Sequence, residues 1–231
     1  MQRARWAGHV AQALRPAGYD AEVVYLVTLL QNLGRLLVHY HFPEEAEQTR
    51  QLMLPAPSPD PAAGVPELLG LSEEAASFAV LGVTSEDVGA AVARHWGLGD
   101  QVLHLIRRLP KDLPVRTPNG DGDRLRATAS AANDAVDAAS TLAGPRLAQA
   151  LTVLAQRYAR SLNVNLRDVQ EALETGRQVL RRGGRVVDAG GADDHVEDGV
   201  DSADADDLPG AQAPGAPTAE RDSAFATSAA G

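Results

Sequence analysis

Apolar residues recur every three or four positions through most of residues 1–183. That spacing is typical of helices that bury one face, and no stretch alternates polar and apolar residues as a half-buried strand would. The pattern therefore predicts an all-α fold.

Capping residues and helix breakers give the boundaries of the predicted helices. Ser72, Thr84, Asp100 and Asn165 are expected to cap the helices that follow them. We expect helices over residues 3–14, 21–40, 44–53, a short stretch after Ser72, 88–96, 100–109, 124–143, about 145–162, and from Asn165 to the Gly183-Gly184 pair, where Arg181 and Arg182 would face the C-terminal dipole.

The helix over residues 21–40 is apolar around most of its circumference, which is typical of a helix surrounded by others. We expect it to be the most buried element. Trp96 is expected in the core, and Gly34 and Gly89 are expected to permit close helix packing.

The composition changes after the last predicted helix. From Asp188 onward the chain has eleven acidic residues and one basic residue, whereas the whole protein has 31 acidic and 21 basic residues, so residues 1–187 hold twenty of each. This tail has almost no large apolar side chains and cannot offset the entropy of ordering. We therefore predict a helical domain over residues 1–183 and a disordered acidic tail over residues 184–231.

Charge and composition narrow the function classes. A neutral body with an acidic tail lacks the basic field that attracts nucleic-acid phosphates, so we expect no nucleic-acid partner. The chain has no cysteine, which excludes disulfides and thiolate chemistry. Neither a signal peptide nor a membrane-spanning run is evident, so we expect a cytoplasmic protein.

Two groups of residues imitate metal sites. His39 and His41 stand near Glu44 and Glu45, but Pro43 interrupts the helix and residues two apart point to different helix faces. Residues 119–123 imitate the start of a calcium loop, yet Arg124 and Ser130 occupy the positions where glycine and glutamate are required. We expect no metal and no cofactor at either place.

Two motifs carry a resemblance to a known family. The apolar run Asp20 to Leu30 leads into Gln31-Asn32-Leu-Gly-Arg35, and Leu81-Gly-Val-Thr-Ser85 leads into Gly-Ala and His-Trp-Gly-Leu98. These motifs resemble the HDOD domain, a degenerate branch of the HD superfamily. The resemblance implies an HD-like helical bundle over residues 1–183.

The same resemblance implies that metal chemistry is lost. Gln31 and Asn32 stand where the family has His-Asp, Ser85 stands where it has a histidine, and Asn133 stands where metal-binding relatives have aspartate. Neutral oxygen donors are weak replacements for imidazole and carboxylate ligands. We therefore expect a non-catalytic bacterial signalling module that acts by binding a protein partner.

HDOD domains normally carry a further N-terminal helical lobe, so the chain is expected to begin inside the domain. Some similar versions follow a protein kinase domain, which leaves two readings open: a shortened relative of such proteins, or a sequence whose start was assigned too late. A domain without its lobe could also associate through apolar surface.

Two other functions stay open. One is a residual metal-dependent phosphohydrolase that uses His39, His41 and nearby acids. The other is a nucleotide-sensing module in the region from Arg107 to Arg126, where four arginines are candidate phosphate contacts: Arg107, Arg108, Arg124 and Arg126.

Overall fold

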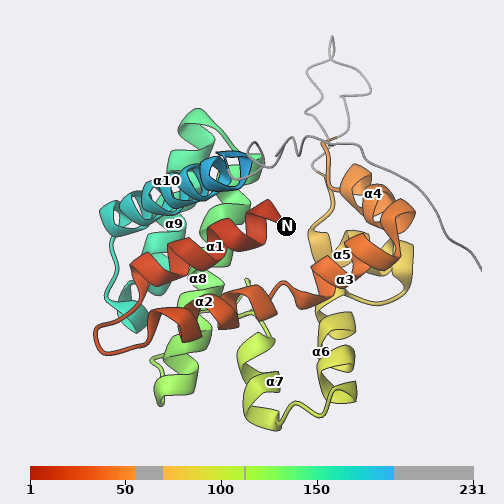
Figure 1. The fold of residues 1–231 in the computed structure, drawn as a ribbon, viewed down its shortest axis with the longest axis horizontal. Helices are drawn as coiled ribbons and strands as arrows, with labels where there is room; N and C mark the ends of the chain where they lie inside the picture. The colour runs from red at the N-terminus through yellow and green to blue at the C-terminus, as the bar shows by residue number, and fades with distance from the viewer. Residues whose placement is uncertain (56–69, 112, 190–231) are drawn as a thin grey trace, which may run out of the picture. The chain divides into compact units, whose positions relative to one another are not determined.

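The computed structural model describes residues 1–55, 70–111 and 113–189, with side chains up to Arg182. These residues form ten α-helices and no strand (Figure 1), which confirms the all-α fold. The helices are α1 (Gln2–Leu14), α2 (Ala21–Leu30), α3 (Leu33–His41), α4 (Pro43–Leu52), α5 (Glu73–Leu81), α6 (Ser85–His95), α7 (Asp100–Ile106), α8 (Asp121–Thr141), α9 (Gly144–Leu162) and α10 (Leu166–Ala189). Most of the acidic tail, from residue 190 onward, lies outside the described residues.

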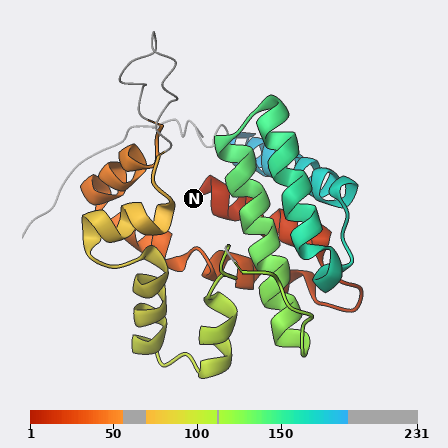
Figure 2. The same cartoon turned by 180° about the vertical axis from the view of Figure 1, so that it is seen from behind.

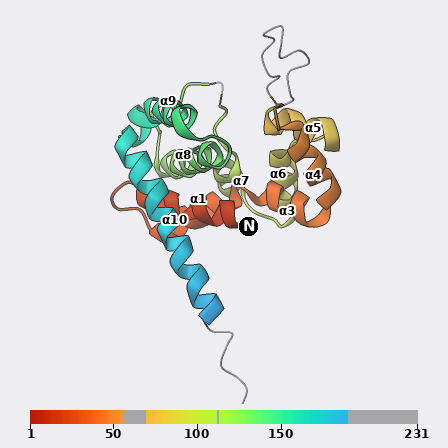
Figure 3. The ribbon, with the colours of Figure 1, turned by 90° about the horizontal axis from the view of Figure 1, so that it is seen from above.

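The main core lies among α1, α2, α8, α9 and α10. Helix α8 packs against α1, α2 and α9, and Figure 2 shows α8 and α9 side by side. The alanines of α8 let these neighbours approach closely, while larger side chains such as Val10, Leu154 and Tyr158 fill the space between them. Helix α10 crosses α1 (Figure 3), and the Trp6 indole N–H donates to the Leu173 carbonyl oxygen at 3.0 Å.

The helices α3, α4, α5 and α6 form a second packed group. Helix α3 contacts α4 and α6, and α4 contacts α5. Where α3 crosses α6, a Cβ on Gly34 would lie 1.6 Å from the Ser85 carbonyl oxygen and 2.8 Å from the Gly89 nitrogen. The backbones therefore touch, which confirms the close packing predicted for Gly34 and Gly89.

The prediction of one helix over residues 21–40 is wrong. The chain breaks at Gln31 and Asn32, and α2 and α3 are bent by 48° relative to each other. This region is also not the most buried element, because Val23 is 46% exposed and Leu26 is 55% exposed. Helix α8 instead has the largest number of buried residues, nine, and α1 buries seven of its thirteen residues.

Three smaller predictions also need correction. Helix α7 ends at Ile106 instead of Leu109, and Asp100 is its first residue, so Gly99 is the capping position. Helix α10 continues through Gly183-Gly184 to Ala189, so Arg181 and Arg182 lie within the helix and not at its end. Trp96 is 57% exposed because it stands at the end of α6, where Gly97, with φ of 73°, turns the chain.

The other predicted caps are present. Ser72 Oγ accepts from the Ala75 amide at 3.2 Å, and Thr84 Oγ1 accepts from the Asp87 amide at 3.1 Å. Asn165 Oδ1 accepts from the amides of Arg167 and Asp168 at 2.8 and 3.1 Å. These bonds satisfy amides that the first turn of a helix leaves unpaired.

Within the described residues, no individual helix is long and apolar enough to cross a membrane. Two bent pairs, α2 with α3 and α5 with α6, reach that length and composition only when their helices are counted together.

Candidate functional site

The break between α2 and α3 brings Gln31 and Asn32 against the middle of α8. Asn32 Nδ2 donates to Asn133 Oδ1 at 2.7 Å, and Asn133 Nδ2 donates to Gln31 Oε1 at 3.1 Å. All three side chains are buried. The structure therefore places together three of the four residues that the motifs singled out, although they are about 100 positions apart in sequence.

Each amide in this cluster is hydrogen-bonded to protein. Asn32 Nδ2 also donates to the Thr28 carbonyl oxygen at 2.9 Å, and Gln31 Nε2 donates to the Leu105 carbonyl oxygen at 3.0 Å. A buried polar group without a partner costs free energy, so these bonds explain how the amides can be buried here. At the α2–α3 break the Asn32 backbone amide donates to the Leu29 carbonyl oxygen at 2.9 Å, while the Asn32 side chain donates to the Thr28 carbonyl oxygen.

The remaining amide oxygen, Asn32 Oδ1, accepts from Arg108. The Arg108 Nη2 atom lies 2.7 Å from this oxygen, and Nη1 lies 2.8 Å from Asp137 Oδ2. A divalent cation on Asn32 Oδ1 would sit roughly 2.0–2.6 Å from that oxygen. The guanidinium and such an ion would therefore compete for one acceptor.

A short extended segment after α7 holds Arg108 in position. The Arg126 guanidinium donates to the carbonyl oxygens of Arg107 and Arg108 at 2.6 and 3.1 Å. Ser130 Oγ accepts from the Leu109 amide at 3.1 Å. Together with Gln31, these contacts fix the backbone of residues 105–109 and explain why α7 does not continue to Leu109.

Asp137 is the centre of an ionic network beside the amides. It accepts from Arg35 at 3.0 and 3.1 Å and from Arg3 at 2.9 Å, in addition to Arg108. Arg35 also pairs with Glu73. The network thus joins α1, α3, α5, α8 and the segment after α7.

The charges in this network are strongly coupled. Burial by itself raises the pKa of Asp137, but the guanidinium groups of Arg35, Arg108 and Arg3 outweigh this effect and hold the pKa well below its ordinary value. Burial likewise lowers the pKa of Arg35, but Asp137 and Glu73 reverse that effect and raise it. Both groups are therefore charged at neutral pH.

A cavity of about 280 Å³ opens beside the cluster. Gln31 and Ser85 line it, and three cationic side chains (Arg35, Arg108 and Lys111) face three acidic ones (Glu73, Glu74 and Glu86) around its wall. Burial is the main cause of a raised pKa at Glu86. Ser85 Oγ lies 3.2 Å from Ser77 Oγ, so it joins the cavity wall and not the amide cluster.

The four arginines proposed as phosphate contacts do not share one site. Arg108 lines this cavity, Arg126 lines a second cavity, and Arg124 lies on a surface with Tyr19 and Asp121. Arg126 also uses its guanidinium to hold the backbone at residues 107 and 108. These arginines are close in sequence, but their charged groups do not converge on one site.

The other candidate ligands are also separate. Across residues 1–55, 70–111 and 113–189, no three His, Asp or Glu side chains lie close enough to share a metal ion. Both His39 and His41 lie in the last turn of α3, where the His41 ring packs edge-on against Tyr40 at 4.9 Å between ring centres. In residues 119–123, which resemble the start of a calcium loop, Asp123 accepts from the Asn119 amide at 3.0 Å and so closes a turn.

Sequence reasoning missed the residues of the ionic network. Arg35 ends the motif that begins at Gln31, but Glu73 and Asp137 belong to no motif, and they lie 38 and 102 positions away from Arg35 in sequence. A signal was nevertheless present: Asp134 and Asp137 interrupt an alanine-rich helix that the core encloses. A charge at such a position needs a partner.

The comparison with protein families gives one match. Residues 1–110 match the model of the HDOD domain. No curated protein and no solved structure matched the chain.

The HDOD match covers both motifs and the segment that carries Arg108. Gln31, Asn32, Ser85 and Arg107 lie inside the matched residues, whereas Asn133, Arg124 and Arg126 lie beyond them. Helix α8 lies wholly beyond residue 110, yet it supplies Asn133 and Asp137 to the site. The matched segment therefore contacts α8 through Gln31, Asn32 and Arg108, in addition to the apolar contacts of α1 with α8 and α10.

Proposed function

We propose that this chain is a non-catalytic regulatory module of a cytoplasmic bacterial signalling pathway and that it acts by binding a protein partner. The HDOD match supports a role in signalling. The likeness of the segment from Gln31 to Arg35 to versions found in kinase proteins also supports a role in signalling.

The observation that carries the non-catalytic part is the contact of Arg108 with the amide cluster. HD-type hydrolysis needs a metal that polarises phosphate and activates water. Here the amide oxygens of Gln31, Asn32 and Asn133 accept hydrogen bonds from protein donors, and the donor to Asn32 is the cationic Arg108 side chain. We infer that Arg108 supplies the positive charge that a metal supplies in active relatives.

Hydrolysis assays test this proposal. The full chain is incubated with Mn²⁺ or Fe²⁺ and a cyclic dinucleotide or bis(p-nitrophenyl) phosphate, with and without EDTA. We expect the wild type to show no more turnover than an Asn32→Ala variant. Any hydrolysis that both proteins show equally would come from contaminating enzymes. Turnover that EDTA abolishes and that Asn32→Ala lacks would establish the phosphohydrolase alternative.

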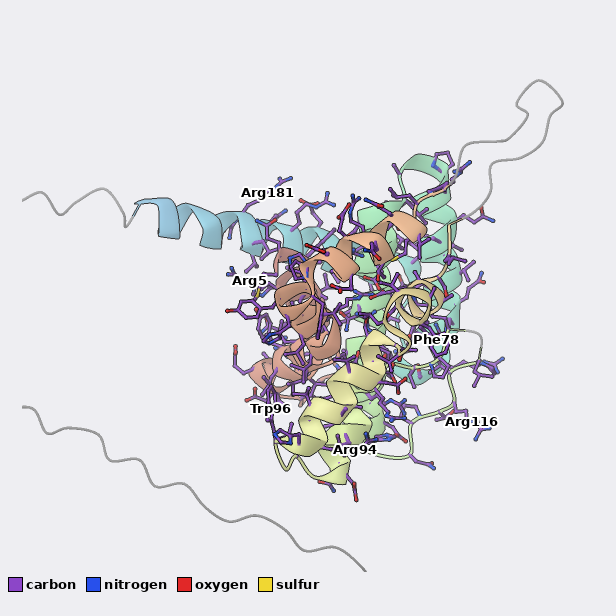
Figure 4. The ribbon with its side chains drawn as sticks, turned by 90° about the vertical axis from the view of Figure 1, so that its right-hand side faces the viewer. Arg5, Phe78, Arg94, Trp96, Arg116 and Arg181 are labelled. Atoms are coloured by element: carbon purple, nitrogen blue, oxygen red, sulfur yellow. The ribbon has the colours of Figure 1, made fainter. Side chains whose placement is uncertain are left out.

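Exposed aromatic residues support a protein partner. Phe78 on α5 is 62% exposed and Trp96 at the end of α6 is 57% exposed (Figure 4). Aromatic side chains are enriched in protein interfaces. A photo-reactive residue at either position, in cells of the source organism, is expected to give a discrete adduct, whereas the same residue at Val153, which is 59% exposed on α9, is expected to give none. Equal labelling at all three positions would contradict a specific surface here.

A further inference from the structure

A second cavity, of about 310 Å³, lies between the loop after α7 and the helices α8 and α9. Its apolar wall includes Leu109, Val115 and Ala127. Arg116, Arg126 and Arg157 line the same space and come from three different elements. This combination of an apolar wall and a few convergent polar groups is typical of sites for small molecules.

Two of these arginines are held in place by the protein. Arg126 donates to the carbonyl oxygens of Arg107 and Arg108. Arg157 Nη1 lies 3.3 Å from Asp134 Oδ2, and its Nη2 donates to the Pro110 carbonyl oxygen. Because these bonds fix the guanidinium planes, a ligand would meet cations that are already oriented.

One donor in this cavity wall has no acceptor. The Arg157 Nε atom is buried and has no hydrogen-bond partner among the described residues. Burial is also the largest influence on Arg126, and it lowers the pKa of that guanidinium. The unpaired Nε shows that the protein leaves part of the hydrogen-bonding capacity of Arg157 unused, and the lowered pKa shows that the Arg126 cation has lost hydration.

The loop that closes this cavity is stiffened by proline. Pro110, Pro114 and Pro118 all line the cavity, and a proline ring fixes the backbone φ angle at its position. The wall is therefore substantially formed before a ligand binds, which reduces the entropy lost on binding.

We propose that this cavity binds a small organic acid with one carboxylate group and an apolar body. The carboxylate would lie between Arg126 and Arg157, since a guanidinium pairs with a carboxylate through two parallel hydrogen bonds. The apolar body would contact Leu109, Val115 and Ala127. This site does not depend on the function proposed above.

The charge of the cavity favours a single negative charge on the ligand. Arg116, Arg126 and Arg157 bring three positive charges, and Asp123 on the wall removes one. Asp134 shares Arg157, which leaves about one positive charge to be compensated. A phosphate monoester, which carries nearly two negative charges at neutral pH, would exceed this balance.

Benzoate and benzamide form a matched pair of probes because they differ in charge but little in shape. We expect benzoate to shift the amide resonances of Leu113 and of residues 115–117 in ¹⁵N-labelled full chain. Benzamide is expected to bind at least about tenfold more weakly. Equal affinities for the two probes, or stronger binding of phenyl phosphate, would overturn the assigned ligand class. Shifts confined to Arg35 and Arg108 would place binding in the first cavity and overturn the assigned site.

Variants test the contribution of individual charges. Arg116 lies on the exposed loop (Figure 4), so Arg116→Gln is expected to fold normally and to weaken benzoate binding several-fold. Arg157→Gln is expected to weaken it at least tenfold. The control is Arg94→Gln on α6, an exposed arginine outside the cavity lining, which should leave affinity unchanged. If Arg94→Gln weakens binding as much as Arg116→Gln, the attraction is non-specific and the proposal is wrong.

Discussion

Replacing Asn133 with alanine removes the side chain that joins α8 to the α2–α3 break. Asn133 is 2% exposed, accepts from Asn32 at 2.7 Å and donates to Gln31 at 3.1 Å. After the change, Asn32 Nδ2 keeps the Thr28 carbonyl oxygen, but Gln31 Oε1 keeps only a long contact of 3.4 Å with Ser130.

The expected loss of unfolding free energy follows from these contacts. Each net hydrogen bond contributes about 1 kcal/mol, and an unsatisfied buried oxygen costs about 1–3 kcal/mol. Asn133→Ala should therefore destabilise the protein by about 2–4 kcal/mol. In urea, this corresponds to a midpoint that is lower by about 1–2 M if the slope is about 2 kcal/mol/M.

The assay is urea unfolding of the full chain, followed by the fluorescence of buried Trp6 on α1. The control is Thr152→Ala on α9, where the hydroxyl bonds only to the Ala148 carbonyl oxygen of its own helix. This control should change stability by less than about 0.5 kcal/mol. An Asn133→Ala variant as stable as this control would refute the view that the amide cluster is a closed, fully bonded network.

Three further changes test other parts of the structure. Gly34→Ala should destabilise the protein by about 1–3 kcal/mol or more, because the added methyl group would overlap the Ser85 carbonyl oxygen. Thermal unfolding measures this loss, and an unchanged melting temperature would contradict the backbone contact. Asp137→Asn should cost about 3–5 kcal/mol at pH 7, because it leaves buried guanidinium groups without their carboxylate. Because the native pKa of Asp137 is lowered, its stabilising contribution is complete above the unfolded pKa of about 4 and is lost as the pH falls toward the native pKa. Urea unfolding should therefore show a smaller difference in stability between wild type and Asp137→Asn at pH 3 than at pH 7. An equal difference at the two pH values would contradict the lowered pKa. Asn165→Ala should cost about 1 kcal/mol by removing the cap of α10, as measured by urea unfolding, and a loss below about 0.3 kcal/mol would argue against the cap.

The sequence predicted helices where local signals decide the structure. Ser72, Thr84 and Asn165 cap helices as expected, because capping depends on residues within one turn. The α2–α3 break was missed because apolar residues continue at helical spacing on both sides of the polar pair Gln31-Asn32. The bonds that accompany the break reach Asn133 and Leu105, and sequence periodicity contains no information about such distant partners.

The site was predicted in part for the same reason. The motifs singled out Gln31, Asn32 and Asn133, and the structure brings them together. The sequence also singles out Arg108 as a candidate phosphate contact, and in the structure it lines the first cavity and binds Asn32 and Asp137. Its role depends on the extended backbone after α7, which Arg126 and Ser130 fix through contacts that no local pattern shows.

The central proposal is that the Arg108 guanidinium occupies the place where HD-type hydrolases would hold a metal. Elemental mass spectrometry of the full chain tests it, after exposure to manganese, iron, zinc and magnesium and removal of loosely bound ions. The account predicts far less than one metal ion per chain, both in the wild type and in Asn32→Ala. One or two tightly held ions per wild-type chain, lost in Asn32→Ala, would contradict it.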